Sequence, residues 1–411
     1  MRFSRLELAR WRQFESIDID FHDRLTVLTG ANGAGKTTLL NILSQHFGWS
    51  TPFVSTSRLT RKGVFRYFTG WLSSRQDLPE QNPSPEIGTL RYSDGSQASL
   101  IVPDDGNAQF HVAISGQCDV RGIFLPSHRP VYSYKRVEQI PTQLDAREQL
   151  FEQYLNNLRQ FYAASARIES PSYRLKAALI SLGTFGYGNE VVERNEEAIA
   201  TFEGFQDALR RVLPPQLGFR RLAVRMPDVV FECQSNDFSL DAASGGIAAI
   251  VDVAWQIYMK SLLEPDGFVV VADEPENHLH PELQRSLLPG LIAAFPNVQF
   301  VVATHNPFMV TSVPDSHVFV MSFDEGTVVS QGLADADRTA SANKVLMDVL
   351  GVPFPMPLWV ETELARVVDS VGSQPVTKEL LASVKDDLAS LGLGHLFPEV
   401  VGRLLDDSQP A

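Results

Sequence analysis

The stretch GANGAGKTT, Gly30–Thr38, constrains this chain more than any other feature, because it stands between an apolar strand-like run and a helix-like run. The order of strand, glycine-rich loop and helix is the context in which the pattern G-x-x-x-x-G-K-[ST] binds phosphate. Gly30, Gly33 and Gly35 let successive backbone N–H groups point inward, and the positive end of the helix dipole adds to this anion site. The sequence therefore predicts an α/β chain with a P-loop nucleotide-binding domain.

The side chains of the same loop predict ATP and Mg²⁺ as its ligands. Lys36 is placed to reach the oxygens of the β- and γ-phosphates, and Thr37 offers a hydroxyl to Mg²⁺. Asn32 and Thr38 complete the residues that we expect to contact the nucleotide. A glycine-rich turn that carries a lysine by chance is the alternative, and the strand–loop–helix context argues against it.

An acidic pair ends the apolar run in VVVADEPENHLHP, where Asp273 and Glu274 follow Phe268–Ala272. Ligand sites in open α/β sheets lie at the carboxyl ends of strands. There Asp273 can hold Mg²⁺ through water, and Glu274 can polarise an attacking water as a catalytic residue. The pair could instead only cap the next helix, but after a P-loop we predict the catalytic role. His278 and His280 have no third ligand near them, so we predict no zinc site there.

A second strand end carries a histidine. In VVATHNPF the apolar run Val298–Ala303 is followed by His305, and Pro307 suits the first turn of a helix. A histidine beside a P-loop can contact the γ-phosphate or the attacking water, whereas on its own it can equally cap the turn. In combination with the other motifs, His305 is predicted to be the second catalytic residue.

The stretch SLDAASGGIAAIVDVAW places Ser244, Gly245 and Gly246 at the start of an apolar helix, Ile247–Met259. A serine hydroxyl and free N–H groups at a helix N-terminus form an anion site. A second such site is redundant for a nucleotide that the same chain already holds, but it is useful if it closes on the γ-phosphate held by another subunit. A glycine-rich turn that feeds a core helix is the alternative.

The order of P-loop, long insertion, Ser-Gly-Gly, Asp-Glu and His resembles the ABC-type ATPase superfamily. The signature of that superfamily is LSGG, and this chain has Ala243 in place of the leucine. The resemblance implies that two heads sandwich two ATP molecules, each between the P-loop of one head and the Ser244–Gly246 motif of the other. It therefore implies a homodimer or a higher homo-oligomer. The Q-loop glutamine of the superfamily has only Gln139 and Gln143 as candidates.

The stretches DEPENHLHPELQ and ATHNPF are similar to the SMC, RecF and OLD-like branch of AAA-type ATP-binding proteins. Several bacterial anti-phage ATPases share this plan, among them ATPase subunits of Septu- and retron-type systems and the OLD nucleases. The tail shows no strands of the kind that the OLD Toprim nuclease domain needs, so we expect a separate effector nuclease as partner. The resemblance implies an ATPase that couples its nucleotide state to DNA or to this effector. A stand-alone RecF-like repair ATPase, a transporter-type subunit, a P-loop kinase and a non-catalytic ATP-binding module are the alternatives.

The pattern of elements predicts a split domain. Residues 1–135 and 225–335 would form the ABC-type ATPase head, with a mixed β-sheet and an antiparallel β subdomain whose hairpin turns at Asp94-Gly95. Residues 136–224 would form a helical insertion, and residues 336–411 a helical tail. The fully apolar strands of the head are typical of a parallel sheet that is covered on both faces.

The charge of the chain limits its expected partners. A net charge of −14 does not favour a general attraction to nucleic acid. Basic residues interleaved with aromatic ones could still contact single-stranded DNA locally, although a solvated, partly packed face explains them equally well. The candidates are Arg58, Arg61, Lys62, Phe65, Arg66, Tyr67 and Trp71 in one set, and Arg129, Tyr132, Tyr134, Lys135 and Arg136 in another.

Neither a membrane span nor a signal peptide is predicted. The longest apolar candidate, Gly245–Leu263, is interrupted by Asp252, Gln256 and Lys260 and falls short of the ~18 uncharged apolar residues that a span needs. The N-terminal residues MRFSRLELAR contain no apolar signal core. We therefore expect a cytoplasmic protein without a membrane partner.

Overall fold

The computed structural model describes residues 1–59, 65–70, 86–103, 106–128, 134–142, 147–163 and 170–333, together with parts of residues 345–401. The chain divides into two compact units, residues 1–345 and 346–411, and each is described by itself. The P-loop and the other motifs named above all belong to the first unit.

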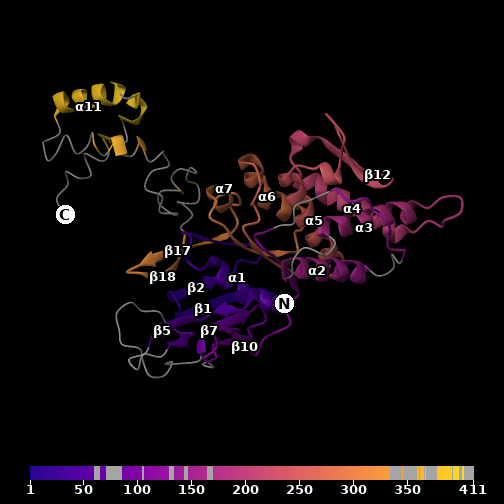
Figure 1. The fold of residues 1–411 in the computed structure, drawn as a ribbon, viewed down its shortest axis with the longest axis horizontal. Helices are drawn as coiled ribbons and strands as arrows, with labels where there is room; N and C mark the ends of the chain where they lie inside the picture. The colour runs from indigo at the N-terminus through magenta and orange to yellow at the C-terminus, as the bar shows by residue number, and fades with distance from the viewer. Residues whose placement is uncertain are drawn as a thin grey trace. The chain divides into compact units, whose positions relative to one another are not determined.

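A mixed sheet is the framework of the first unit (Figure 1). Among the described residues it has eleven strands, and the five neighbouring strands β17, β3, β16, β15 and β11 run parallel to one another. In sheet order the strands are β10 (Ala113–Ser115), β8 (Gln97–Ile101), β7 (Glu86–Tyr92), β1 (Phe3–Trp11), β2 (Phe14–Asp20), β18 (Thr327–Gly332), β17 (His317–Asp324), β3 (Leu25–Gly30), β16 (Gln299–Ala303), β15 (Val269–Asp273) and β11 (Gly122–Leu125).

The burial patterns of the strands differ between the antiparallel and the parallel parts of the sheet. β1, β2 and β7 alternate between buried and more exposed residues, as expected for antiparallel strands with one face on the core. β3, β15 and β16 are buried along their whole length, as expected for parallel strands covered on both faces. The predicted hairpin at Asp94-Gly95 is confirmed as the turn between β7 and β8. The antiparallel strands thus continue the sheet of the ATPase head itself.

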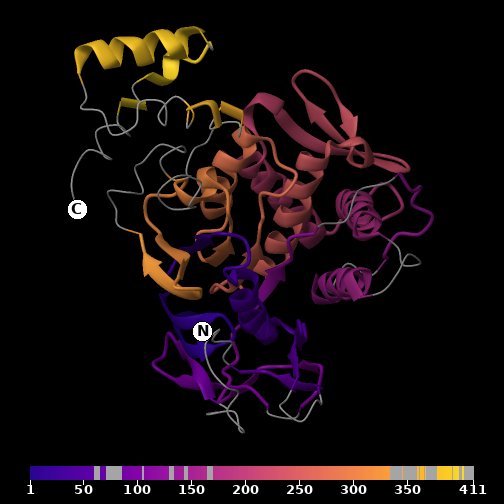
Figure 2. The same cartoon turned by 60° about the vertical axis from the view of Figure 1, so that its left-hand side comes forward.

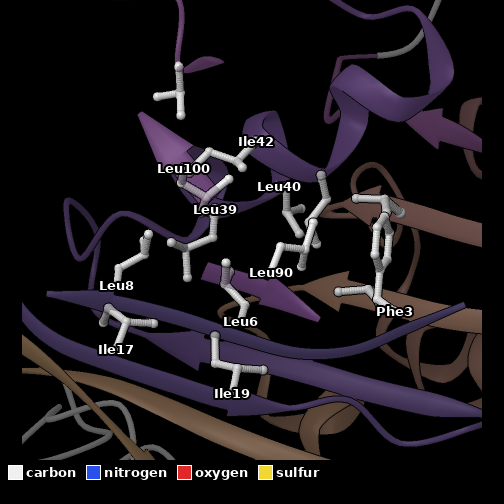
Figure 3. Packing of buried hydrophobic residues seen from close by; sticks show 14 of the residues in the cluster. Phe3, Leu6, Leu8, Ile17, Ile19, Leu39, Leu40, Ile42, Leu90 and Leu100 are labelled. Carbon is white, nitrogen blue, oxygen red and sulfur yellow. The ribbon is translucent and has the colours of Figure 1, made fainter. Parts of the chain in front are cut away.

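Helix α1 (Lys36–Ser44) packs against both parts of this sheet. Leu39 and Leu40 point toward side chains of β1 and β7, including Leu6 and Leu90 (Figure 3), and Ile42 belongs to the same buried cluster. The same helix also contacts β3, β15 and β16. One buried cluster therefore joins the antiparallel strands, the parallel strands and the helix that follows the P-loop.

The chain between β11 and β12 (Phe219–Arg225) forms three α-helices among the described residues. Ser170 caps α3 and Pro171 occupies its first turn, so the helix begins there. The helix continues through Gly183, where a Cβ would lie 2.7 Å from the side chain of Val224, and it ends at Tyr187 with Gly188 as its cap. The helices are α2 (Arg147–Ala163), α3 (Pro171–Tyr187) and α4 (Glu196–Val212).

The insertion helices pack on the second half of the head. α2 and α4 contact α5 (Gly245–Leu263), and α4 also contacts α6 (Pro281–Ala294). In both overall views these helices lie beside α5, while the N-terminal strands lie at another end of the unit (Figure 1 and Figure 2). The amphipathic α4 buries Ile199, Phe202 and Phe205 in this contact region.

Several short elements complete the described chain. After the insertion the chain forms a hairpin of β12 (Phe219–Arg225) and β13 (Asp228–Cys233). The remaining elements are β4 (Phe53–Val54) with β9 (Gln109–Phe110), β5 (Thr56–Leu59) with β6 (Phe65–Phe68), β14 (Phe238–Ser239), α7 (Pro307–Val310) and the short 3₁₀ helices Gln45–Phe47, Pro215–Leu217 and Leu240–Ala242. The second unit contains α11 (Lys378–Ser390) and the 3₁₀ turn Gly394–Leu396 around a small cluster that includes Leu364 and Leu388.

One helix among the described residues, α5, has the length and composition that could cross a membrane. Inside the protein, 72% of its apolar window is buried. Its Asp252 and Gln256 are buried as well, and the two side chains are joined by a hydrogen bond of 2.9 Å. These are properties of a core helix, since such a helix passes the same test of length and composition.

Candidate functional site

Strand register brings the segments of the predicted site to one edge of the sheet. β16 lies between β3 and β15, and Ala303 is in register with both Leu28 and Asp273. The three strands are parallel, so their carboxyl ends point to the same edge, where ligands bind in open α/β sheets. The P-loop, Glu274 and His305 follow directly from these strand ends and therefore meet, although they are far apart in the sequence.

The P-loop curls around its lysine. Gly30, Gly33 and Gly35 have φ angles of 129°, 81° and 93°, a region that glycine adopts without strain. Lys36 Nζ donates hydrogen bonds to the carbonyl oxygens of Gly30 and Ala31 at 2.9 and 3.1 Å. Burial lowers the pKa of Lys36, although the nearby site carboxylates oppose that shift. The ammonium group is thus held at the loop, where it can exchange carbonyl oxygens for those of a phosphate.

Thr37 and Asp273 connect the P-loop to β15. The hydroxyl of Thr37 donates to Asp273 Oδ2 at 2.9 Å. Burial raises the pKa of Asp273, and the hydrogen bond from Thr37 opposes this effect. A hydroxyl and a carboxylate beside a P-loop are the side chains that hold Mg²⁺ in P-loop NTPases, so this pair fits the predicted ion. Of the other predicted loop contacts, Asn32 is exposed and Thr38 is half-buried.

Glu274 and His305 form a contact between the ends of β15 and β16. His305 Nδ1 lies 2.8 Å from Glu274 Oε1, while Asn277 donates to Glu274 Oε2 at 2.9 Å. The backbone N–H of Glu274 donates to the carbonyl of Ala303 at 2.8 Å. Glu274 has a φ of 45°, an uncommon conformation that clusters at functional sites. Both oxygens of this carboxylate are therefore oriented by neighbours, as a group that positions water requires.

Sequence reasoning missed Glu276 and Thr304 as a structural link in this site. Thr304 donates its hydroxyl hydrogen bond to Glu276 Oε1, and the backbone N–H of Asn306 donates to Thr304 Oγ1 at 2.9 Å. Glu276 is buried, and its other oxygen has no hydrogen-bond partner among the described residues. Burial raises the pKa of Glu276, and the carboxylate of Glu274 adds to that shift. Glu276 thus ties the loop after β15 to the loop that carries His305.

We expect Glu276→Gln to stabilise the protein increasingly as the pH rises. Folding raises the pKa of Glu276 above its ordinary 4.5, so the group favours folding only while it is protonated. Its contribution is complete below pH 4.5 and is lost as the pH rises through the folded-state pKa. Glutamine still accepts from Thr304 but does not ionise, so thermal midpoints should converge at acidic pH and diverge toward about pH 8.

Glu276→Ala provides the comparison for this prediction. It removes the acceptor of Thr304 and leaves a cavity, so it should lower the free energy of unfolding by about 1–3 kcal/mol at acidic pH, and this loss should shrink as the pH rises. A Glu276→Gln protein whose thermal midpoints parallel those of the wild type across the whole pH range would contradict a raised pKa of Glu276 in the folded protein.

The Ser244–Gly246 motif lies at the start of α5. Ser244 caps this helix and accepts from the N–H of Ile247 at 3.5 Å. Ser244 and Gly245 are exposed, and a Cβ on Gly245 would have open space around it. Gly246 lies against the carbonyl of His278, in the loop after Glu274. Among the described residues, no hydrogen bond or ion pair joins Ser244 to the P-loop of the same chain.

The other sequence candidates are only partly described. Phe65 and Tyr67 of β6 are 70% and 43% exposed. In the second set, the Tyr134 ring lies over Lys176 of α3, and Lys135 lies over the ring of Tyr173. Several candidates lie outside the described residues: Arg61, Lys62, Trp71, Arg129, Tyr132 and Gln143, together with the side chains of Arg58 and Arg66. Arg136 is exposed. Gln139 lines a cavity of about 300 Å³ with residues of α2, α3 and α5.

Two segments of the chain match models of known families. Residues 5–77 match one described as "AAA domain", and residues 260–311 match one described as "AAA domain, putative AbiEii toxin, Type IV TA system". The first segment contains the P-loop, and the second contains Asp273, Glu274 and His305. The two matches therefore fall on the elements that the register of β3, β16 and β15 brings together.

Individual proteins resemble the chain over shorter stretches. "Retron Vc95 probable ATPase" of Vibrio cholerae serotype O1 biovar El Tor is 28% identical over 131 residues, which are 31% of this chain and 24% of that protein. "Septu protein PtuA" of Bacillus mycoides strain KBAB4 is 30% identical over 103 residues, which are 24% of this chain and 14% of that protein. The chain thus spans a quarter or less of the length of these curated relatives.

Among solved structures, the SMC head domain from Thermotoga maritima is similar at 14% identity and a TM-score of 0.44, covering 81% of this chain and 100% of that one. The site itself consists of a P-loop, a hydroxyl–carboxylate pair and a Glu–His contact at adjacent strand ends. Together with the two matched segments, it shows that the chain carries an ABC-like ATPase domain of AAA type and is distantly homologous to a retron ATPase and to Septu protein PtuA.

Proposed function

We propose that the chain is a Mg²⁺-dependent ATPase that dimerises around ATP, with each nucleotide held between the P-loop of one protomer and the Ser244 loop of the other. One observation carries the proposal: the folded chain assembles only part of its predicted site. The assembled part is Lys36, Thr37, Asp273, Glu274 and His305. Ser244 lies exposed at the start of α5, so a second copy can use it to complete the pocket.

In this proposal each side chain has a separate task. Lys36 binds the β- and γ-phosphate oxygens, and Thr37 and Asp273 hold Mg²⁺, which neutralises charge on the phosphates. Glu274 orients the attacking water and accepts its proton, while His305 contacts the γ-phosphate. Hydrolysis removes the group that joins the two protomers, so the dimer loosens, as in other switches controlled by a γ-phosphate.

We further propose that an effector nuclease on a separate chain, or DNA, reads this change in assembly as part of anti-phage defence. The distant homology to a retron ATPase and to Septu protein PtuA supports this setting. The exposed Phe65 and Tyr67 support local contact with a single strand, because aromatic side chains stack on bases. The net charge of −14 argues that any such contact is local.

The ATP sandwich predicts that two inactive variants restore each other. Lys36→Met lacks a working P-loop, and Ser244→Arg blocks the loop that closes on the partner's ATP. A mixed dimer has one intact site, made from the P-loop of the Ser244→Arg protomer and the Ser244 loop of the Lys36→Met protomer. An equal mixture should therefore regain up to about a quarter of the wild-type rate of phosphate release, because half of the dimers are mixed and each has one working site of two.

Two controls make this experiment decisive. Each variant incubated at twice its concentration without the other should stay inactive, and monomeric Ser244→Arg should bind ATP as the wild type does. Folded variants that gain no activity on mixing, or a Ser244→Arg protein with full activity alone, would refute the composite site.

A further inference from the structure

A fully buried lysine lies beneath the Ser244 loop. The side chain of Lys176, on α3, is only 1% exposed. Its ammonium group donates to Asp241, to Asp228 at 3.3 Å and to the backbone carbonyl of Lys135 at 2.6 Å. The ring of Tyr134 covers it, with 5.0 Å from Nζ to the ring centroid. None of these contacts involves the residues that we assign to ATP hydrolysis.

The acceptors of Lys176 come from three separate segments. Asp228 begins β13, Lys135 belongs to the described segment 134–142, and Asp241 lies in the 3₁₀ turn Leu240–Ala242. A charge taken out of water must keep all of its partners, because the loss of one leaves the others uncompensated. The lysine therefore fixes these three segments to α3 in one arrangement, which is the best-supported role of buried ion pairs.

Asp241 links this buried cluster to the signature motif. Only Ala242 and Ala243 separate it from Ser244, and Ala243 N–H closes the turn with a bond to Leu240. Because the connection is this short, a movement of Asp241 would also move Ser244. From the other side, Gly246 packs so closely on His278 that a Cβ there would lie 3.2 Å from its carbonyl oxygen.

We propose that Lys176 is a positioning residue whose ion pair with Asp241 orients the Ser244 loop to close on the ATP of a second copy. This inference rests on the proposed function. Since Lys176 lies on α3, its ion pair connects the helical insertion to the turn that precedes the Ser244 loop. A partner that moves α3 would thereby change the assembly of the ATP site without touching a nucleotide.

The test uses the full-length chain with Glu274→Gln as the parent, so that bound ATP is not hydrolysed. Lys176→Met combined with Asp241→Asn removes both charges of the pair and leaves no ionised partner at Asp241. We expect the affinity of the monomer for a fluorescent ATP analogue to stay within about twofold, and ATP-dependent dimerisation to weaken by about tenfold or more. The readout is sedimentation across a range of protein concentrations with Mg²⁺ and ATP.

A matched lysine variant and the single variants complete the design. Lys260→Met removes a lysine from α5 whose ion pair, at 3.3 Å, is with Glu264, the residue that caps the end of the same helix, so it should leave both measurements unchanged. The two single variants should each weaken dimerisation, and their effects should not add, because both break one pair. This non-additivity in assembly, with ATP binding intact, is not expected of a lysine that only supports the fold.

The outcomes separate this inference from the proposed function. A parent protein that stays monomeric with ATP refutes the ATP sandwich itself. A parent that dimerises and a folded double variant that dimerises equally well refute only the role of Lys176. Loss of ATP binding and of the cooperative thermal transition together would also refute it, because Lys176 would then serve folding alone.

Discussion

Glu274→Gln is expected to slow ATP hydrolysis by about 10²- to 10⁴-fold while ATP still binds. The glutamine oxygen can accept the hydrogen bond from Asn277, but the amide cannot take a proton from water. Lys36 and the Thr37–Asp273 pair are untouched, so the nucleotide and its ion remain held. The ATP-bound dimer should therefore accumulate, which phosphate release and size measurements with Mg²⁺ and ATP would show together.

Glu325 offers a control that matches both the residue type and the backbone. It lies in the turn between β17 and β18 with a φ of 44°, against 45° for Glu274, and its side chain is exposed. Glu325→Gln should hydrolyse ATP at the wild-type rate and cycle between monomer and dimer. A Glu274→Gln protein that hydrolyses ATP normally would remove the residue from catalysis, and one that stays monomeric with ATP would contradict the sandwich.

Gly30→Ala should abolish ATP binding and lower the free energy of unfolding by about 3 kcal/mol or more. The backbone φ of Gly30 is 129°, which is strained for any residue with a Cβ. A Cβ there would lie 2.2 Å from the carbonyl oxygen of Met321 in β17, and neither backbone can yield without breaking the parallel pairing of β3. Thermal unfolding and binding of a fluorescent ATP analogue measure the two effects separately.

Gly95 and Gly33 separate steric overlap from backbone strain. Gly95, in the hairpin turn, has a φ of 87° and open space around a built Cβ, so Gly95→Ala should cost only about 1 kcal/mol and retain ATP binding. Gly33→Ala has the same open space but lies in the phosphate loop, so it should weaken ATP binding with little loss of stability. If Gly30→Ala behaved like Gly95→Ala, the contact with Met321 could not be the reason for a glycine at that position.

The local patterns in the sequence predict much of this site. Each of the three segments combines an apolar strand with polar residues at its exit, and both features are set by neighbours within about ten residues. The hairpin at Asp94-Gly95 and the helix starts at Pro281 and Pro307 follow from the same kind of local chemistry. The P-loop, Glu274 and His305 then meet because the carboxyl ends of adjacent parallel strands lie at the same edge of the sheet.

The contacts missed by the sequence patterns join side chains that are far apart along the chain. The bond between Thr304 and Glu276 depends on the pairing of β15 with β16, and nothing near either residue indicates the other. Lys176 does carry a local signal, because it interrupts the apolar run of LKAALISL, where a lysine must either be exposed or be paired. Its partner Asp241 follows only from the fold, as does the continuation of the antiparallel strands into the sheet of the head.

The placement of β3 has a consequence for how the protein is made. Val27 pairs in register with Val302 on one side and with Val318 on the other, so the strand that supports the phosphate loop is synthesised long before either of its neighbouring strands. Contacts of such long sequence separation form slowly and leave apolar edges open in the meantime. A nascent chain that stops before β16 therefore lacks both neighbours of β3 and offers chaperones an unpaired strand that is buried along its whole length in the folded protein.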